Sequence, residues 1–331
     1  MNTSFIRAAV CGLWVATVCQ AAPPVTLKVD LENVVGYWDD GVEFAKLGSD
    51  SRVTTPTATR RIFQSQVQLG DIVAVNGRPA KGTFVMNARN LNVTTAFAPG
   101  QSVADTTRNG IAQYTFEFLQ QDGTPIGVIF VSALNGGTPS PGAPLGSGQA
   151  SSTITGGTGA FRGARGQAAS APAAVAVRNA SFTEDTASRR TNGGGKVQYL
   201  LQLIPDQRPD VVMTAIGPAV MHAADNLPVT NGNPARAGET LVLYATGLGP
   251  VRGAIDVGQP FPASPAVVVN SPVEVNINGV AARIMTAEGY PGTDDGYAVT
   301  FTLPQDLTPG MADLQLTAAW IQSSVVKIPI Q

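Results

Sequence analysis

The sequence predicts an all-β protein, an eight-stranded antiparallel barrel followed by a β-sandwich. Short stretches in which apolar and polar side chains alternate recur along the chain, and period two is the signature of strands. Only 13% of the 331 residues are charged, while glycine is plentiful with 36 residues. That composition favours strands and turns, and no helical periodicity longer than two turns interrupts it.

Residues 1–21 are predicted to be a signal peptide. Arg7 precedes an apolar run, Ala8–Cys19, that is too short to span a bilayer. The run leads into the small-x-small pattern Cys19-Gln20-Ala21, so we expect cleavage near Ala21, although a buried N-terminal strand is the alternative. Cleavage would make the protein secreted, to an extracellular, cell-surface or periplasmic location, without a transmembrane segment in the mature chain. It would also remove both cysteines and with them any disulfide or thiolate metal site.

The first predicted unit, residues 22–207, contains eight strand candidates. The stretch "VTLKVDLENVV" alternates cleanly from Val25 onward. The other seven candidates lie at 61–75, 82–95, 111–120, 124–134, 149–155, 166–180 and 195–205. Eight antiparallel strands favour a closed barrel, because closure removes the edges that an open sheet must protect.

The second predicted unit, residues 208–331, begins within "IPDQRPD" (204–210), where prolines and charges interrupt the apolar pattern. Its strand candidates are shorter and evenly spaced, at 239–248, 271–279, 280–289, 296–304, 311–320 and 323–331. Asn278-Gly279 between two of them is typical of a hairpin turn. This spacing predicts a sandwich of immunoglobulin type.

The glycine-rich stretch Thr153–Gln167 must either bind an anion or shape the backbone. A phosphate loop needs a lysine, but none occurs between Lys81 and Lys196, and Arg162 stands where a dinucleotide fingerprint needs its third glycine. We therefore predict no cofactor. Gly156, Gly157 and Gly159 are instead expected to take positive φ angles in a tight connection between two barrel strands, and Gly163 and Gly166 to let the backbone bend or bulge at a barrel corner. Phe161 is expected to pack inward as a plug.

The stretch "GGTGAFRGARG" (156–166) resembles the Gly-Gly-Thr-Gly-x-Phe-x-x-Ala-Arg-Gly motif of dirigent proteins and their relatives in the allene oxide cyclase-like barrel superfamily. "LGDIVAVNGRPAKGTF" (69–84) and "QQDGTPIGVIFV" (120–131) are similar to the strand and turn pattern of that superfamily. The resemblance covers residues 25–205. It implies an eight-stranded barrel whose interior holds a small apolar or phenolic ligand, and a homo-oligomer formed through the barrel exterior.

From about Gly217 to its end, the chain resembles the immunoglobulin-like C-terminal domain of secreted acidobacterial proteins, which is similar to IPT/TIG domains. That family has no assigned chemistry. The resemblance implies a bacterial exported protein.

Few residues suit catalysis or metal binding. His222 is the only histidine, which excludes a histidine-containing triad in the barrel and a multi-histidine metal site, so we expect it to be structural or exposed. The acidic stretches "YWDDG" (37–41) and "TDDG" (293–296) are predicted as turns, because Asp before Gly is turn chemistry. No metal site is predicted, and no catalytic residue is assigned.

The candidate ligand-binding residues are Arg165, Glu117, Asp30, Glu32 and Phe161. Arg165 comes from the family motif, and its alternative role is to tie the corner loop to a neighbouring carbonyl or carboxylate. Glu117, Asp30 and Glu32 lie on strands, where alternation alone does not say which face points inward. An inward carboxylate beside Tyr114 or Phe116 could act as a general acid, whereas an outward one is merely solvated.

Three functions remain open at this point. The first is an exported, non-enzymatic protein whose barrel binds a small apolar ligand or a partner, with the second unit as an attachment or spacer module. The second is a cyclase or isomerase of dirigent type, and the third is an adhesion or structural protein of the cell surface. A net charge of −2 offers no field for nucleic acid. An open lumen with inward ionisable groups would favour the enzyme, an apolar lumen binding, and a packed lumen adhesion.

Overall fold

The computed structural model describes residues 23–40, 62–92, 108–135 and 150–331, apart from 207, 254 and 257. The predicted signal peptide lies outside these ranges. In the described ranges the only helical segment is a 3-10 turn, η3 (Thr186–Arg189), and no helix is long and apolar enough to cross a membrane. The protein is all-β, as the sequence predicts.

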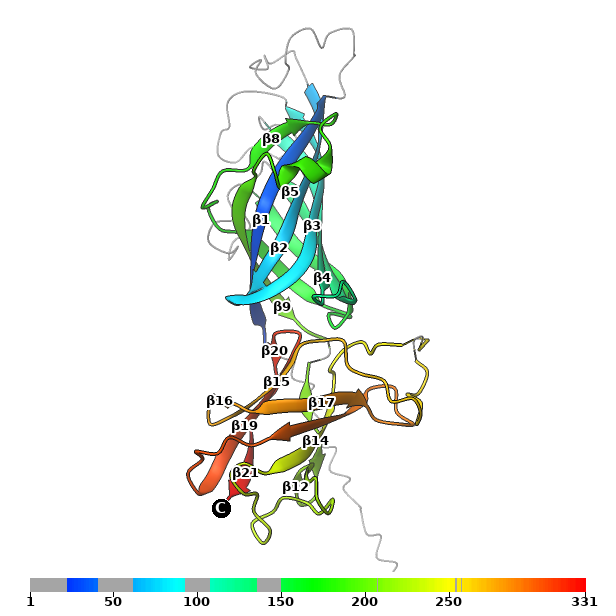
Figure 1. The fold of residues 1–331 in the computed structure, drawn as a ribbon. Helices are drawn as coiled ribbons and strands as arrows, with labels where there is room; N and C mark the ends of the chain where they lie inside the picture. The colour runs from blue at the N-terminus through cyan, green and yellow to red at the C-terminus, as the bar shows by residue number, and fades with distance from the viewer. Residues whose placement is uncertain are drawn as a thin grey trace, which may run out of the picture.

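The first part of the chain is a closed antiparallel barrel (Figure 1). Its eight strands are β1 (Val25–Asp40), β2 (Ile62–Val75), β3 (Arg78–Asn92), β4 (Arg108–Leu119), β5 (Pro125–Asn135), β6 (Ala150–Gly159), β7 (Arg165–Ser170) and β9 (Gly195–Ile204). Neighbours in that order are paired, and β1 closes the ring because it pairs with both β2 and β9. Alternation works as predicted in β1, where Leu27, Val29 and Leu31 are buried.

Two predicted elements differ in the structure. The stretch 166–180 is not one strand, because β7 ends at Ser170 and the chain then leaves the barrel wall before β8 (Arg178–Ser181), which pairs in parallel with the far part of β1. The predicted turn at 37–41 is also wrong, since Tyr37–Asp40 continue β1 and pair with β2. Cross-strand hydrogen bonds outweigh the local turn preference of the aspartates there.

The glycine-rich stretch joins two neighbouring barrel strands, as predicted: β6 ends at Gly159 and β7 begins at Arg165. Gly159 and Gly163 have positive φ angles of 60° and 71°. Gly157, like Gly156, lies within β6 without a positive φ, which corrects the prediction. A Cβ on Gly157 would overlap the backbone of Phe161, whose ring turns into the barrel.

The second part of the chain forms two antiparallel sheets that pack as a sandwich. One sheet contains β10 (Asp210–Val211), β13 (Val220–His222), β14 (Thr240–Thr246), β18 (Gly296–Thr302) and β17 (Arg283–Gly289). The other contains β16 (Val280–Ala281), β15 (Val273–Ile277), β19 (Gly310–Ala318), β20 (Ile321–Gln322) and β21 (Val326–Ile330), and a small hairpin adds β11 (Met213–Thr214) and β12 (Gly217–Pro218). Asn278-Gly279 turns between β15 and β16 with both φ angles positive, as the hairpin prediction requires.

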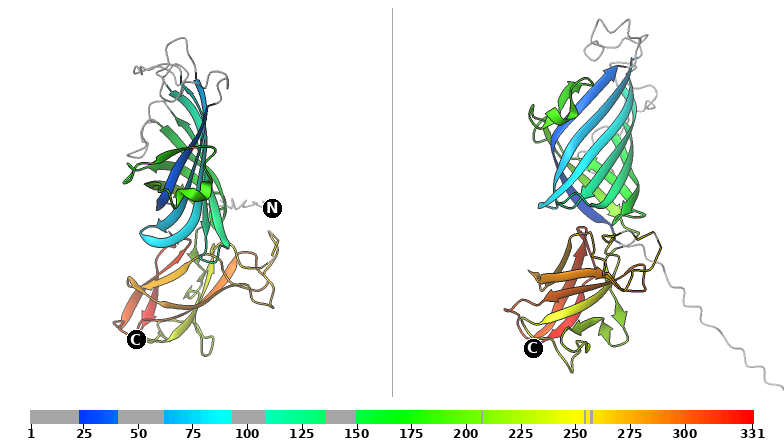
Figure 2. Two further views of the ribbon diagram at one scale, coloured as in Figure 1. Left: turned by 45° about the horizontal axis from the view of Figure 1, so that its top comes forward. Right: turned by 45° about the vertical axis from the view of Figure 1, so that its right-hand side comes forward.

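The sandwich lies against one end of the barrel, here called the lower end (Figures 1 and 2). The turn between β19 and β20 reaches this end, so that Ala319 and Ile321 are part of the barrel core and the Trp320 ring lies 5.6 Å from that of Phe118, between centroids. Asn270 of the sandwich, which is 3% exposed, accepts a hydrogen bond from the Thr124 hydroxyl and donates one to the Pro125 carbonyl. At the opposite, upper end, β1 ends at Asp40, β3 at Asn92 and β5 at Asn135.

Candidate ligand site in the barrel lumen

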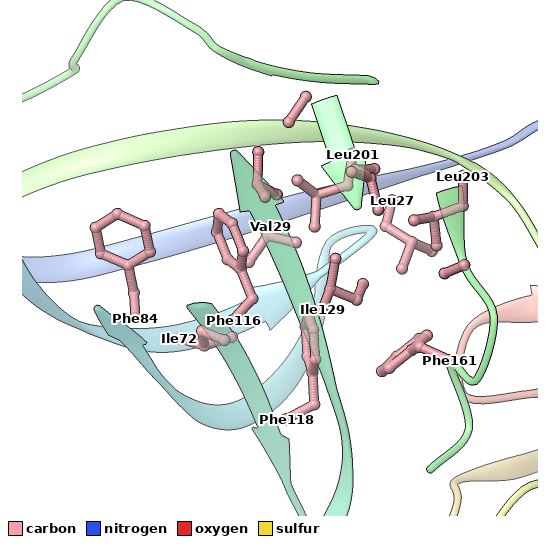
Figure 3. Close-up of a cluster of buried hydrophobic side chains, with 14 of the residues drawn as sticks. Leu27, Val29, Ile72, Phe84, Phe116, Phe118, Ile129, Phe161, Leu201 and Leu203 are labelled. Atoms are coloured by element: carbon pink, nitrogen blue, oxygen red, sulfur yellow. The ribbon is translucent and has the colours of Figure 1, made fainter. Parts of the chain in front are cut away.

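The lower half of the lumen is filled by large apolar side chains that point inward from the strands and from the glycine-rich turn (Figure 3). Each of the following is at most 2% exposed: Leu27, Val29, Ile72, Phe84, Phe116, Phe118, Ile129, Phe161, Leu201 and Leu203. These side chains form the core of the barrel.

Toward the upper end, the inward side chains become small. Phe84, Phe116 and Ile129 are cross-strand neighbours in one ring of the lower lumen. Four residues further up their strands, the inward positions are Ala88, Ala112 and Ala133, which are cross-strand neighbours in the same way. Ser152 and Gln66 extend this upper ring on either side. The upper ring thus presents methyl groups where the lower ring presents large side chains, and its three alanines are still buried in the barrel core, at most 4% exposed.

Two tyrosines mark the boundary between the halves. The rings of Tyr114 and Tyr199 lie 6.0 Å apart edge to face, and Tyr199 also packs against Phe84 and Phe116. A cavity of about 30 Å³ opens here, lined by Tyr114, Phe116, Val131, Ser152, Ala168, Ala169, Ser170 and Tyr199. That volume holds a water molecule or two, at roughly 10–15 Å³ each.

The site is polar but uncharged. Burial raises the pKa of Tyr199 well above its usual range, and the nearby Tyr114 raises it further. Tyr199 therefore keeps its proton and can donate a hydrogen bond at any physiological pH. At inward positions whose side chains the structure describes, the barrel strands carry no carboxylate, amine, guanidinium or imidazole. The described lumen can bind through hydroxyl and amide groups.

The three candidate carboxylates face the exterior. Asp30 accepts a hydrogen bond of 2.7 Å from the amide of Gln198, and Glu32 forms an ion pair of 2.6 Å with Lys196. Glu117 accepts a hydrogen bond of 2.6 Å from the Thr83 hydroxyl, while the buried Phe116 and Phe118 on either side point inward. The outward alternative is the one observed for all three.

The other two candidates lie far from the upper lumen. Phe161 is buried as predicted, in the lower lumen, with its ring 5.0 Å from that of Phe118. Arg165 is exposed at the start of β7, next to the glycine-rich turn. The structure thus brings none of the five candidates together with the upper lumen.

Sequence reasoning missed the polar lumen residues Gln66, Ser152, Ser170 and Tyr199. A signal for one of them is present in β9, where "YLLQL" places Tyr199 on the same face as Leu201 and Leu203. To find the other three, one would have needed to know which face of each strand points into the barrel. Bulges change that face within β1, β2 and β6.

Outside the barrel, His222 is buried in the sandwich and structural. Its Nδ1 lies 2.6 Å from Glu239 Oε1 and its Nε2 lies 3.2 Å from the Asn233 carbonyl. "TDDG" is a turn as predicted, in which the Thr293 hydroxyl accepts a hydrogen bond from the Gly296 amide. Among the described residues, no three His, Cys, Asp or Glu side chains are grouped so that they could hold a metal ion.

No model of a known protein family matches the chain, and a search of curated proteins finds no match either.

Proposed function

We propose that the protein is an exported bacterial binding protein whose upper lumen holds a small, largely apolar molecule bearing a hydroxyl or phenol group. The observation that carries the proposal is the change of side-chain size along the lumen. Aromatic and aliphatic side chains close the lower half, and three alanines together with uncharged polar side chains surround the upper half. Lined in this way, the upper lumen resembles a small-molecule site, which is mostly apolar with a few placed polar groups.

The polar groups suit a hydroxyl ligand. Tyr199 can donate a hydrogen bond, and the hydroxyls of Ser152 and Ser170 beside it can donate or accept one. An apolar body would pack against Ala88 and Ala112, which offer methyl groups and no charge. A phenol or an alcohol with an apolar body would match both the hydroxyl groups and the methyl groups of the lining.

The same lining argues against a cyclase or isomerase of dirigent type. General acid–base catalysis needs a group whose pKa is close to the working pH. The pKa of Tyr199 is shifted away from neutrality, and Asp30, Glu32 and Glu117 lie outside the barrel. Binding without chemistry is the simpler function for these residues.

An adhesion or structural role is the second candidate, and one observation favours it. The cavity at Tyr114 and Tyr199 measures only about 30 Å³, which holds a water molecule or two and no larger ligand as it stands. In either case we propose that the sandwich serves as an attachment or spacer module. It also closes the lower end through Trp320. Homo-oligomers through the barrel exterior are compatible with both roles.

Two experiments test the proposal. Native mass spectrometry of the protein from its own host should detect a bound small molecule. Titration with 1-naphthol, an apolar ring system with one hydroxyl, should saturate at one molecule per chain, and Ala112→Leu should weaken this binding about tenfold because it fills the upper ring. Ala281→Leu, on an exposed strand of the sandwich, is the matched control.

Circular dichroism must show that both variants are folded. The adhesion role is supported if no small molecule copurifies with the protein and Ala112→Leu leaves naphthol binding unchanged. Conversion of a bound phenol into a new product would support the isomerase instead.

A further inference from the structure

A second hollow, here called the junction groove, lies where the sandwich meets the lower end of the barrel. Its volume is about 520 Å³, within the range of roughly 300–1,000 Å³ that is typical of small-molecule sites. Asn76 and Arg78, at the turn between β2 and β3, line it from the barrel. Asn276, Gln315 and Trp320 line it from the sandwich. Figure 1 shows β15 and β20 below the barrel at this junction.

The floor of the junction groove is the outer face of the sheet formed by β15 and β19. Val275 and Leu316 form a cross-strand pair that is fully buried in the sandwich core. The residues before and after them in each strand therefore point to the opposite, outer face. Asn276 pairs directly with Gln315 on this outer face. Glu274 and Thr317 form the next pair along the strands. The floor is thus a row of amides, a hydroxyl and one carboxylate.

The charged groups of the junction groove are bound to the protein itself. Arg78 forms an ion pair with Glu274 across the junction. Arg208 donates a hydrogen bond of 2.6 Å to the carbonyl of Gln322. With two cations and one carboxylate, the lining has a small net charge. Arg78 is paired with Glu274, whereas Arg208 uses only one nitrogen and its Nε is buried without a hydrogen-bond partner in the described structure.

Most of the uncharged groups are available. Gln315 donates a hydrogen bond of 3.3 Å from Nε2 to the Ser323 carbonyl, and Asn76 Oδ1 accepts one from the Lys28 amide, so Gln315 Oε1 and the Asn76 NH₂ group remain. Within the described part of the chain, the side chains of Asn276, Thr317 and Gln322 make no hydrogen bond. Each amide can donate and accept, and the hydroxyl can do both as well. Trp320 adds an apolar surface, because it packs on Phe118 and also lines the groove. An aromatic ring beside paired amides offers both kinds of contact to one ligand.

We propose that the junction groove binds a saccharide chain. A sugar presents hydroxyls that donate and accept hydrogen bonds, which match the amides of Asn276 and Gln315. Its C–H faces match the indole of Trp320. The groove is polar and large, whereas the upper lumen is lined by methyl groups, so the two sites select different ligands. Because the saccharide bridges Asn76 of the barrel and Asn276 of the sandwich, binding also strengthens the junction.

Isothermal titration of the full chain with cellohexaose, chitohexaose and hexagalacturonate tests the proposal. At least one neutral hexasaccharide should bind and perturb the Trp320 indole signal in the NMR spectrum. The double variant Asn276→Ala/Gln315→Ala should weaken binding about tenfold or more. Its matched control is Asn87→Ala/Gln113→Ala, which removes another exposed, cross-strand pair of amides from the outer wall of the barrel. This control should leave binding unchanged.

Three outcomes would overturn the proposal: none of the three hexasaccharides binds, the control weakens binding as much as the groove variant does, or only hexagalacturonate binds and high salt abolishes it. The last outcome would mean that the arginines capture an anion. Ala112→Leu, which fills the upper lumen, should leave saccharide binding intact, so failure at one site is distinguishable from failure at the other.

Discussion

The lower and upper halves of the barrel lumen are built from the same strands and the same alternation, yet one is lined by large apolar side chains and the other by alanines. Phe84, Phe116 and Ile129 fill the lower ring, while positions four residues away, roughly 13 Å along each strand, are all alanine. Alternation decides which side chains face inward. The volume of those side chains decides whether the cylinder is filled.

The largest effect is expected in the lower ring. Phe116→Ala should lower the free energy of unfolding by about 3–5 kcal/mol, because it opens a cavity between Phe84 and Tyr199. Urea denaturation would measure the change. Phe130→Ala removes the same ring from the outer wall, where Phe130 is 40% exposed, and should cost under about 1 kcal/mol. Equal losses of unfolding free energy in the two variants would contradict the assignment of Phe116 to a packed core.

The next effect concerns the seal at the lower end. Asn270→Ala removes three hydrogen bonds: one from the Thr124 hydroxyl, one to the Pro125 carbonyl and one of 2.9 Å from Arg252 Nε. Leaving these buried groups without a partner should cost about 2 kcal/mol. Calorimetry should then resolve two transitions, one for the barrel and one for the sandwich. A single transition at an unchanged temperature would show that the seal does not depend on Asn270. Asn87→Ala, on the exposed outer wall, is the control.

A smaller effect depends on pH and belongs to the sandwich. Burial lowers the pKa of His222, but its hydrogen bonds to Glu239 and to the Asn233 carbonyl raise it more, so the net shift is upward. A raised pKa in the folded state stabilises the protein fully below the unfolded value of 6.5, and this contribution is lost as the pH rises through the folded pKa. The free energy of unfolding should therefore fall above pH 6.5.

His222→Gln should flatten this pH dependence and cost about 1 kcal/mol at pH 6. Urea denaturation at pH 6 and pH 9 would test it. Identical pH profiles for the variant and the parent protein would contradict the assignment. Phe116→Ala should keep the pH dependence of the parent, since the lumen and His222 lie in different cores.

The smallest effect is expected at Arg165. Its side chain is exposed on the outer wall, so Arg165→Ala should change the free energy of unfolding by less than about 0.5 kcal/mol. It should also leave naphthol binding unchanged. A clear loss of binding would restore Arg165 as a ligand contact and place the ligand near the glycine-rich turn.

Much of the fold was predictable because it depends on local patterns. Alternation located the barrel strands, and the glycines of the 153–167 stretch located the turn between β6 and β7. Tyr37–Asp40 and residues 166–180 were predicted wrongly. In both, hydrogen bonds to a distant strand, or their absence, decided the conformation.

The candidate site was less predictable. Glu117 and Phe116 are neighbours on one strand, so only one of them can face inward. A shift of one residue moves every side chain of the strand to the opposite face. The structure places Phe116 inside and Glu117 beside Thr83 on the outer wall. Tyr199 lies in the lumen site because β9 brings it against Phe84 of β3 and Phe116 of β4.

By itself, the sequence determined the strand periodicity, the tight turns at glycine and the all-β class, because these follow from backbone geometry and from neighbours along the chain. Only the tertiary structure decided which face became the lumen, how far that lumen was filled, and that Trp320 of the sandwich completes the core of the barrel. These properties depend on contacts between residues far apart in the chain, which local patterns do not encode.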